Sequence, residues 1–353
     1  MKIVVNDIAA SMGGAMTVLR DFYAFICEND KENQWIFLLN DKYFEETENV
    51  KILTLPHVKR SRLRKLWFDF FSGRRFIGRL QPDIVLSLQN IITFGLKIPQ
   101  VVFIHQSIPF QNQKRFSFLK SEERELAVIQ HWIGRIIKQS AKKANRVIVQ
   151  TEWMRQSVMQ QCKLSEDKVL VSVPGIKAVP LEAQKRIFSP KEFFYPTAPL
   201  IYKNNDCVYA ASAMLDYKGI EHTVTLTLPS DKSKGSVRCV GRLLYATVMA
   251  NYRRSTLIFP SYIETFGYPL AEARQAGTII LAADTAFSRE VLADYENAYF
   301  FDPFCPKDLA GLMEQVALGN IIKKPSWNQS KTPTNGWKVV LDLTRDLGSV
   351  CNE

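Results

Sequence analysis

Two glutamates, Glu264 and Glu272, stand eight positions apart in a segment that reads Pro-Ser-Tyr-Ile-Glu-Thr-Phe-Gly-Tyr-Pro-Leu-Ala-Glu-Ala. Glu264 follows an apolar run that is typical of a strand, and Glu272 falls within the helical pattern after it. Gly267, between them, allows the backbone to approach a ligand closely. Backbone N–H groups at the start of a helix suit a phosphate, and carboxylates accept hydrogen bonds from sugar hydroxyls. The combination favours a nucleotide sugar as the ligand.

Three further sites follow predicted strands. Gly13 and Gly14 come after the first strand and open a helix, where paired glycines let backbone approach a pyrophosphate, although a simple tight turn explains them equally well. His105 ends an apolar run and could donate to a sugar hydroxyl or a phosphate, although a lone histidine is more often structural. Lys203, with Asn204 after it, could meet a diphosphate as a point charge, although most lysines are simply solvated.

Strand-like and helix-like segments alternate along the whole chain, which predicts an α/β fold with two doubly wound parallel sheets. We expect a first domain over residues 1–176, a linker over 177–190 and a second domain over 191–325. Residues 326–353 form a tail, in which 336–347 could be a helix that crosses back to the first domain. Between residues 39 and 83 we expect no strand, and over 122–144 we expect one long helix.

A basic segment with interleaved aromatic and aliphatic residues lies between His57 and Arg79. Such a segment suits the surface of an anionic membrane. The residues expected to form a membrane or acceptor surface are Lys59, Arg60, Arg62, Arg64, Lys65 and Trp67. The alternative is a solvated helix that covers the core, with Trp67 and Phe70 or Phe71 inside. Nucleic acid is not expected as a partner, because no nucleic-acid-binding motif accompanies the charge.

The composition is that of a globular chain with room for two domains: 353 residues, 46% apolar and 23% charged, with a net charge of +11. No apolar run is long enough to cross a membrane, and the first residues lead directly into a strand rather than a signal peptide. The six cysteines are scattered, which is typical of reduced thiols. We therefore expect a cytoplasmic protein. No D-x-D motif is present, so we expect neither a metal nor a cofactor.

The segment over 259–273 resembles the P-S-x-x-E-x-F-G-x-P-x-x-E-A pattern of the bacterial family of retaining glycosyltransferases with the E-x7-E motif, of the group 1 or family 4 type. Weaker likenesses lie over 146–153, 171–176 and 195–204. The resemblance implies the GT-B fold, in which two Rossmann-like domains face a central cleft. It also implies a nucleoside diphosphate sugar as donor substrate.

By this resemblance, Glu272 would bind the nucleotide ribose, and Lys203, next to Asn204, would neutralise the leaving diphosphate. Glu264 would hold the donor sugar and the distal phosphate. The resemblance gives a supporting role to backbone groups on the same loop, those of Thr265, Phe266 and Gly267.

For the first domain, the resemblance implies that Gly13 and Gly14 let it close over the donor, and that His105 contacts the donor sugar. The family often has an arginine a few residues before the lysine, and none lies over 195–202. Arg242 and Arg254 are candidates to replace it.

The reaction implied is transfer of a hexosyl or deoxyhexosyl group to an acceptor hydroxyl with retention of the anomeric configuration. The basic segment suggests a lipid-linked oligosaccharide acceptor, and so a peripheral enzyme at the inner face of the cell membrane. That would place the chain in the assembly of capsule, O-antigen or exopolysaccharide. The alternatives are a non-catalytic GT-B-like binding subunit and a nucleotide-sugar epimerase of the same fold.

Overall fold

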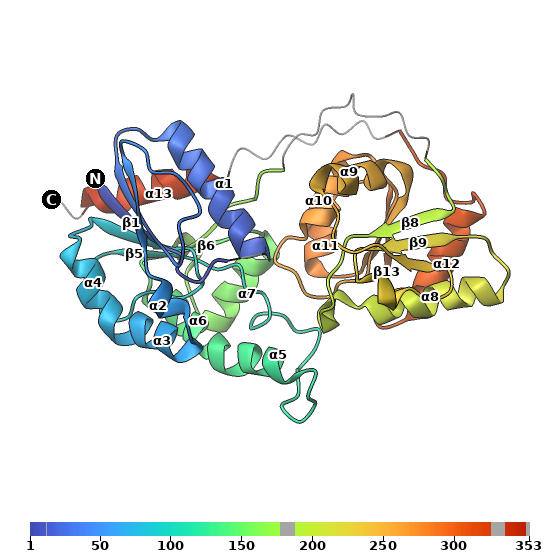
Figure 1. The fold of residues 1–353 in the computed structure, drawn as a ribbon, viewed down its shortest axis with the longest axis horizontal. Helices are drawn as coiled ribbons and strands as arrows, with labels where there is room; N and C mark the ends of the chain where they lie inside the picture. Colours follow the sequence, from blue (N-terminus) through green and yellow to red (C-terminus); the bar gives the residue numbers. More distant parts are fainter. Residues whose placement is uncertain (12, 177–187, 326–335, 351–353) are drawn as a thin grey trace. The chain divides into compact units, whose positions relative to one another are not determined.

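The computed structural model describes residues 1–11, 13–176, 188–325 and 336–350 (Figure 1). The chain divides into two compact units. The first contains Met1–Leu119, Arg124–Pro174 and the final helix, and the second contains the short segment Lys120–Glu123 and the described residues from 175 to 325. The expected linker over 177–190 lies outside the described residues up to position 187, as does the tail over 326–335.

The first unit is built on a sheet of seven parallel strands in the order β3-β2-β1-β4-β5-β6-β7. The strands are β1 (Lys2–Asn6), β2 (Gln34–Leu39), β3 (Val50–Thr54), β4 (Ile84–Ser87), β5 (Gln100–Phe103), β6 (Arg146–Val149) and β7 (Val169–Val171). Most are apolar on both sides, as strands covered by helices on both faces must be. The order reverses between β1 and β4, as in doubly wound folds.

Helices cover both faces of this sheet. They are α1 (Gly13–Asn29), α2 (Pro56–Lys59), α3 (Arg62–Trp67), α4 (Gly73–Arg79), α5 (Arg124–Val128), α6 (Gly134–Lys143), α7 (Glu152–Cys162) and α13 (Trp337–Val350). Single π-helical turns, η1 (Phe68–Ser72) and η2 (Ile129–Ile133), join α3 to α4 and α5 to α6, and a short 3₁₀ turn (Glu166–Lys168) precedes β7. One face packs on α1 and α13, and the other packs on the helices of the α2–α4 and α6–α7 segments.

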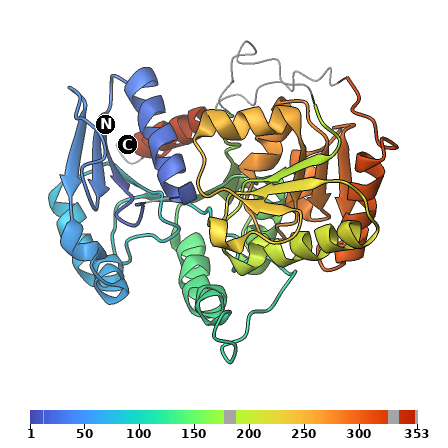
Figure 2. The same cartoon turned by 45° about the vertical axis from the view of Figure 1, so that its right-hand side comes forward.

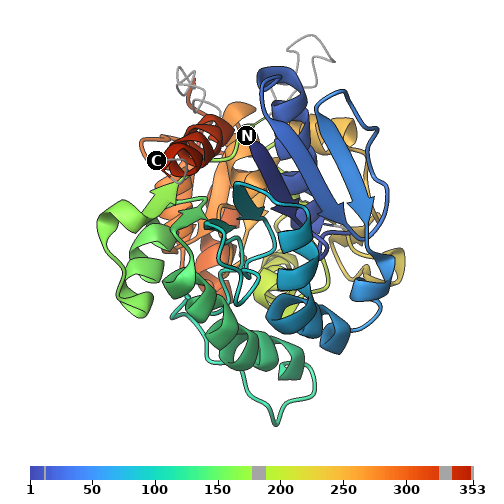
Figure 3. The same ribbon diagram turned by 90° about the vertical axis from the view of Figure 1, so that its left-hand side faces the viewer.

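The final helix, α13, belongs to the core of the first unit. Trp337 is 8% exposed, and its ring lies 4.9 Å from that of Phe22 in α1 and 5.4 Å from that of Phe103 in β5, measured between ring centroids. Val340 is fully buried in the same cluster. Figure 3 shows this helix, in red, on the first unit beside the N-terminal strand.

The second unit has a six-stranded parallel sheet in the order β10-β9-β8-β11-β12-β13. The strands are β8 (Glu192–Tyr195), β9 (Thr223–Leu226), β10 (Val237–Cys239), β11 (Thr256–Phe259), β12 (Ile280–Ala283) and β13 (Ala298–Phe301). The helices are α8 (Asn205–Tyr217), α9 (Tyr245–Arg254), α10 (Tyr268–Gln275), α11 (Ala286–Val291) and α12 (Pro306–Ala317), and 3₁₀ turns cover Ile201–Lys203 and Ser230–Lys232. Helices α8 and α12 pack together on one face (Figure 2).

The predicted α/β class and the two doubly wound sheets are confirmed. Two expectations were wrong in detail. Val50–Thr54 forms the edge strand β3, where no strand was expected, and the helix expected over 122–144 is interrupted by the π-turn η2. Among the described residues, no helix has the length and apolar character that crossing a bilayer requires.

Candidate functional site

The second sheet reverses its strand order between the neighbouring strands β8 and β11. Their connections leave in opposite directions, so the loops at the carboxyl ends of these two strands diverge. In open α/β sheets this is the place where ligands bind. Lys203 lies in the loop after β8 and Glu264 in the loop after β11. The topology therefore brings two predicted site residues to the same edge of one sheet.

The side chains of Lys203 and Glu264 form an ion pair at this edge. The Nζ atom of Lys203 lies 2.5 Å from Oε1 of Glu264, and both side chains are about one-fifth exposed, at 18% and 19%. Ser261, which is fully buried, donates its hydroxyl to the same carboxylate oxygen at 2.8 Å. A half-enclosed ammonium fixed by a carboxylate is well placed to exchange that partner for a phosphate.

Two partly buried hydrogen bonds hold the Lys203 loop in position. The hydroxyl of Tyr195, at the end of β8, donates to the backbone carbonyl of Lys203 at 2.9 Å. Asn204 adopts a left-handed conformation with φ of 56°, and its amide nitrogen donates to the carbonyl of Pro303 at 2.6 Å. The Asn204 amide is therefore engaged with backbone, and it joins the loop after β8 to the loop after β13.

Gly267 ends the Glu264 loop and begins helix α10. Its φ of +82° lies in the left-handed region, and a Cβ atom there would come within 3.3 Å of Leu270. Glycine is the residue that adopts this conformation without steric cost. The loop can thus turn sharply at Gly267, between the buried ring of Phe266 and the first turn of α10.

Glu272 lies one turn into α10 and is partly buried. Burial raises the pKa of its carboxyl to about 7, although hydrogen bonds from Tyr252 and Tyr245 act in the opposite direction. The hydroxyl of the buried Tyr252 donates to Oε2 of Glu272 at 3.2 Å. A carboxyl group in this state is an acceptor that a hydroxyl-bearing ligand can recruit.

Arg254 does not lie at this edge, so its proposed role near the diphosphate is wrong. It pairs with Glu192, the first residue of β8, at the amino end of the sheet. The physical reason is its position: a residue that immediately precedes a parallel strand lies at the opposite edge from a residue that follows one. Arg242 follows β10 and has an exposed side chain, so its role stays a prediction.

In the first unit, His105 follows β5 and is held by Asn90. The backbone N–H of His105 donates to Oδ1 of Asn90 at 2.7 Å, and the amide nitrogen of Asn90 lies 3.1 Å from Nε2 of the imidazole. Because that amide nitrogen can only donate, Nε2 must accept, and the proton of the neutral ring belongs on Nδ1. Burial lowers the pKa of His105 to about 4, so the ring is neutral at pH 7.

The Nδ1 atom of His105 is buried and has no hydrogen-bond partner among the described residues. The same is true of both carboxylate oxygens of Asp7, which follows β1, and of Oε1 of Gln89, which follows β4. Buried polar atoms are nearly always paired, so such a group at one sheet edge suggests a place for water or ligand. Burial raises the pKa of Asp7 to about 7, against the opposing charges of Lys65 and Lys59.

Sequence reasoning did not identify four partners of the site residues, Ser261, Tyr252, Tyr195 and Asn90, nor the buried carboxylate of Asp7. The four partners are recognised by the hydrogen bonds that they make in the folded protein, which a linear pattern does not reveal. The position of Asp7 directly after a strand was the one available indication.

Gly13 and Gly14 open helix α1, as predicted. Gly13 has φ of +65°, and a Cβ atom added at either position would meet nothing within 4 Å. The backbone there is consequently open on the side where a side chain would stand. This geometry permits a close backbone approach and does not by itself show a ligand.

Within the basic segment, the arginines and the lysines differ in how far their charged groups are exposed. Arg60, Arg62 and Arg64 are exposed, whereas the ammonium of Lys65 points inward and lies 2.5 Å from the buried carboxylate of Asp69. Lys59 donates to the backbone carbonyl of Ala9 at 2.8 Å. Lys65 is therefore not part of the exposed surface.

The exposure of the aromatic residues in this segment tests the alternative to a membrane surface, which is a solvated helix that covers the core. Trp67 is 62% exposed and Phe71 is 52% exposed, so the expectation that Trp67 lies inside, with Phe70 or Phe71, is wrong for Trp67 and Phe71. Phe70 is partly buried and stacks on Phe94 with ring centroids 4.4 Å apart, and Phe68 is buried in the core.

The comparisons with known proteins agree with this architecture. Residues 12–178 match the family described as Glycosyltransferase Family 4, and residues 232–329 match the family described as Glycosyl transferases group 1. No curated protein gives a significant sequence match.

Solved structures share the fold at low identity. The lipopolysaccharide outer core galactosyltransferase WaaB has a TM-score of 0.65 and 15% identity, over 98% of this chain and 99% of WaaB. HepE of Anabaena, in complex with UDP-glucose, has a TM-score of 0.62 and 15% identity, over 100% of this chain and 99% of HepE. TarM has a TM-score of 0.55 and 16% identity over 78% of this chain, which spans 57% of the length of TarM.

The match of one glycosyltransferase family to each half of the chain, together with these neighbours, supports a GT-B glycosyltransferase.

Proposed function

We propose that this chain transfers a glycosyl group from a nucleoside diphosphate sugar to an acceptor hydroxyl, with retention at the anomeric carbon. The observation that carries the proposal is the ion pair between Lys203 and Glu264 at the point where the second sheet reverses its strand order. The UDP-glucose complex of HepE, a protein of the same fold, supports a nucleotide sugar as the donor.

In this proposal the diphosphate takes the place of Glu264 at the ammonium of Lys203. The negative charge that develops on the leaving diphosphate is then stabilised by a positive group that is already in position, which is the main requirement of this chemistry. Glu264, released from the pair, accepts hydrogen bonds from hydroxyls of the donor sugar. Glu272, on the next helix, accepts hydrogen bonds from the ribose.

Retention is proposed to follow from attack on the same face that the diphosphate leaves, with the departing phosphate taking the proton of the acceptor hydroxyl. No covalent glycosyl–enzyme intermediate is invoked. His105, Gly13 and Gly14, in the first unit, keep the roles that the family resemblance implies as predictions.

We further propose that the acceptor is a lipid-linked oligosaccharide and that the protein acts as a peripheral enzyme in the assembly of a cell-surface polysaccharide. The exposed arginines and Trp67 of the basic segment support contact with an anionic membrane. The name of the neighbour WaaB, an outer-core transferase of lipopolysaccharide, is consistent with such a role.

The test combines binding and turnover. A thermal-shift panel of nucleoside diphosphates and nucleotide sugars should raise the apparent melting temperature for at least one, because a ligand that binds only the folded state stabilises it. Release of the nucleotide from that sugar should then be lost in Lys203→Ala and kept in Lys191→Ala, which removes an exposed lysine paired with Glu221 in the same unit.

Other outcomes identify the alternatives. Binding without turnover in the wild type, unchanged in Lys203→Ala, would indicate a non-catalytic subunit. Conversion of the nucleotide sugar to an epimer in the absence of any acceptor would indicate an epimerase. No stabilisation by any nucleotide in the panel would contradict the proposed function.

A further inference from the structure

Two helical segments of the first unit carry the same rare irregularity. In each, a single π-turn, η1 or η2, interrupts an α-helix and is followed at once by a glycine. Gly73 donates its N–H to the carbonyl of Phe68, and Gly134 donates to that of Ile129. A Cβ atom at Gly73 would lie 2.6 Å from the carbonyl oxygen of Phe68, and one at Gly134 would lie 2.8 Å from Pro109. Both turns therefore require glycine.

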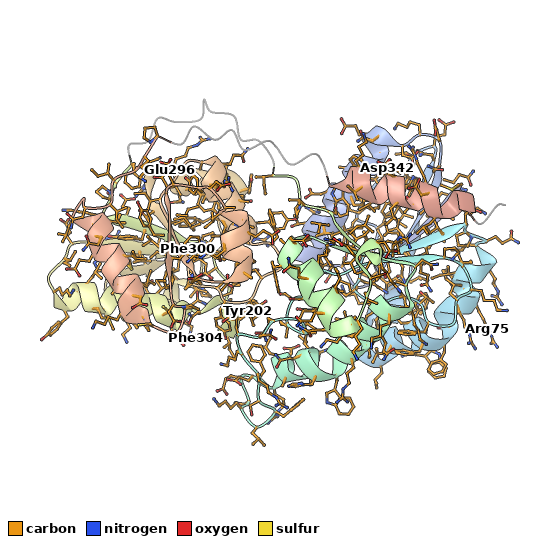
Figure 4. The ribbon with its side chains drawn as sticks, turned by 180° about the vertical axis from the view of Figure 1, so that it is seen from behind. Arg75, Tyr202, Glu296, Phe300, Phe304 and Asp342 are labelled. Atoms are coloured by element: carbon orange, nitrogen blue, oxygen red, sulfur yellow. The ribbon has the colours of Figure 1, made fainter. Side chains whose placement is uncertain are left out.

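Single π-turns are uncommon and occur frequently at functional sites. Each of these two lies beside a surface groove. The first groove, of about 450 Å³, is lined by residues that include Trp67, Phe71, Arg74, Arg75 and Arg79. The rings of Trp67 and Phe71 lie against each other with their centroids 4.6 Å apart. Figure 4 shows Arg75 at the outer surface of the first unit.

The second groove, of about 610 Å³, is also lined by arginines and large apolar side chains, which come from a different part of the chain. Its lining includes Arg115, Phe118, Leu119, Trp132 and Arg135. Leu119 is 93% exposed and Trp132 is 66% exposed. Among the described residues that line the two grooves, none is acidic.

The two grooves lie along one border of the first unit. Arg62 of α3 pairs with Glu125 of α5, so an exposed ion pair links the two helices that lead into the π-turns. Figures 1 and 3 both show α3 and α5 along the same lower border of this unit. The exposed tryptophans Trp67 and Trp132 therefore belong to neighbouring helical segments.

We infer that the two grooves form a two-point anchor for an anionic phospholipid bilayer. The inference rests on the membrane contact proposed above and extends it to a second, independent chain segment, residues 115–135. Tryptophan favours the boundary between headgroups and acyl chains, and arginines attract anionic headgroups. Charge complementarity favours an anionic bilayer, because arginines line both grooves together with exposed apolar side chains.

The anchor has a consequence that a single contact lacks. Once one groove is bound, the other is held close to the membrane, so the two contacts strengthen each other. Loss of either contact therefore lowers the affinity of the whole protein more than it would if the two contacts bound independently. Two contacts also fix the orientation of the first unit on the membrane, whereas one allows it to pivot.

The experiment is co-sedimentation of the full chain with vesicles of phosphatidylglycerol and phosphatidylcholine, compared with phosphatidylcholine alone. The variant Trp67→Ser/Phe71→Ser disrupts the first groove, and Leu119→Ser/Trp132→Ser disrupts the second. The matched control, Tyr217→Ser/Leu318→Ser, replaces exposed apolar residues of the second unit, which are 94% and 59% exposed. A further variant, Arg115→Gln/Arg135→Gln, removes charge and keeps the apolar residues.

We expect the wild type to bind the anionic vesicles and not the neutral ones. Each groove variant should lower the partition coefficient about tenfold or more, and the control should bind like the wild type. The arginine variant should lose about fivefold per charge, and the loss should diminish at high salt. A thermal-shift titration with the nucleotide sugar, without lipid, should be unchanged in all variants, which shows that each is folded.

Two results would overturn the inference. Wild-type binding by Leu119→Ser/Trp132→Ser, with a loss in the first-groove variant, would remove the second contact and leave the membrane contact proposed above intact. Equal binding to neutral and anionic vesicles, or an equal loss in the control, would show that the two grooves are not a charge-selective anchor. Neither result bears on nucleotide binding, so failure of this inference is distinguishable from failure of the transferase proposal.

Discussion

The ammonium of Lys203 and the carboxylate of Glu264 are 61 residues apart in the chain and 2.5 Å apart in the folded second unit. Each holds the other in place. Ser261 supports the carboxylate and Tyr195 supports the backbone of the lysine loop. The pair is therefore built into the two loops that flank the reversal of strand order, and is not a chance contact between mobile side chains.

Removing the ammonium should reduce turnover more than donor binding. In Lys203→Ala, kcat should fall on the order of a hundredfold or more, because the positive charge that stabilises the leaving diphosphate is lost. Steady-state kinetics of nucleotide release measures this. Lys191→Ala is the control, since it breaks an exposed pair in the same unit. Equal activity in the two variants would refute the role of Lys203.

Donor affinity should depend on pH through Glu272. Its pKa is raised to about 7 in the free protein by burial, so the carboxyl is about half ionised at pH 7. If the ionised form binds the ribose hydroxyls, affinity for UDP-glucose should rise about tenfold between pH 6 and pH 8. Calorimetric titration over this range measures the change.

The matched variants for this pH dependence are Glu272→Gln and Tyr252→Phe. The glutamine variant should bind weakly with no pH dependence, because it cannot ionise. The phenylalanine variant removes a hydroxyl that donates to the carboxyl, so its binding curve should shift to higher pH. A glutamine variant with the wild-type pH profile would show that another group titrates.

His105 should be neutral and protonated at Nδ1 around pH 7. Its pKa is lowered to about 4 by burial, so its contribution opposes folding at acid pH: stability is lost as the pH falls from about 6.5 toward 4, by up to about 3 kcal/mol. Nitrogen chemical shifts of the imidazole report both the pKa and the tautomer.

Replacing the residue that holds His105 tests how the tautomer is set. In Asn90→Ala, Nε2 loses its donor, so the Nε2-protonated form should become populated and the pKa should move toward 6.5. Asn40→Ala, which also removes a partly buried amide bonded to backbone carbonyls in the first unit, should leave the His105 resonances unchanged. An unchanged tautomer in Asn90→Ala would contradict the assignment.

Asp7 should destabilise the first unit at neutral and alkaline pH. Because burial raises its pKa to about 7 in the folded state, the folded form binds the proton more tightly than the unfolded form does. The favourable contribution is present below about pH 4 and is lost as the pH rises through 7. Asp7→Asn, which cannot ionise, should therefore be more stable than the wild type at pH 8.

The gain in the free energy of unfolding of Asp7→Asn over the wild type should be larger at pH 8 than at pH 5, by on the order of 2 kcal/mol. Urea unfolding at the two pH values measures the difference. Asp83→Asn, at a partly exposed position of the same unit, serves as the control. A gain that does not depend on pH would show that Asp7 is not the titrating group.

The periodicity of the chain was sufficient to predict the fold class, both sheets and almost every strand. Buried parallel strands such as Ile84–Ser87 are short apolar runs, and such runs are readable in a sequence. The edge strand Val50–Thr54 was missed because half of its residues face solvent and it interrupts no helical pattern. The π-turns were missed because their sole linear mark is one glycine each.

The candidate site was predicted less completely than the fold. Lys203 and Glu264 were identified because both lie in loops that follow strands, and strand ends share an edge. Their partners Tyr195 and Ser261 were not, because those contacts depend on how the loops lie in three dimensions. Arg254 was misplaced although the sequence held the needed information, because a residue just before a strand lies at the opposite edge from residues that follow strands.

The position of α13 bears on how this protein is made. Trp337 packs against Phe22 and Phe103, so the core of the first unit is incomplete until synthesis has passed residue 337. A nascent chain that stops before residue 337 would expose the apolar residues that α13 covers, and chaperones bind such surfaces. A helix that is made after the sheet of the second unit thereby completes the core of the first.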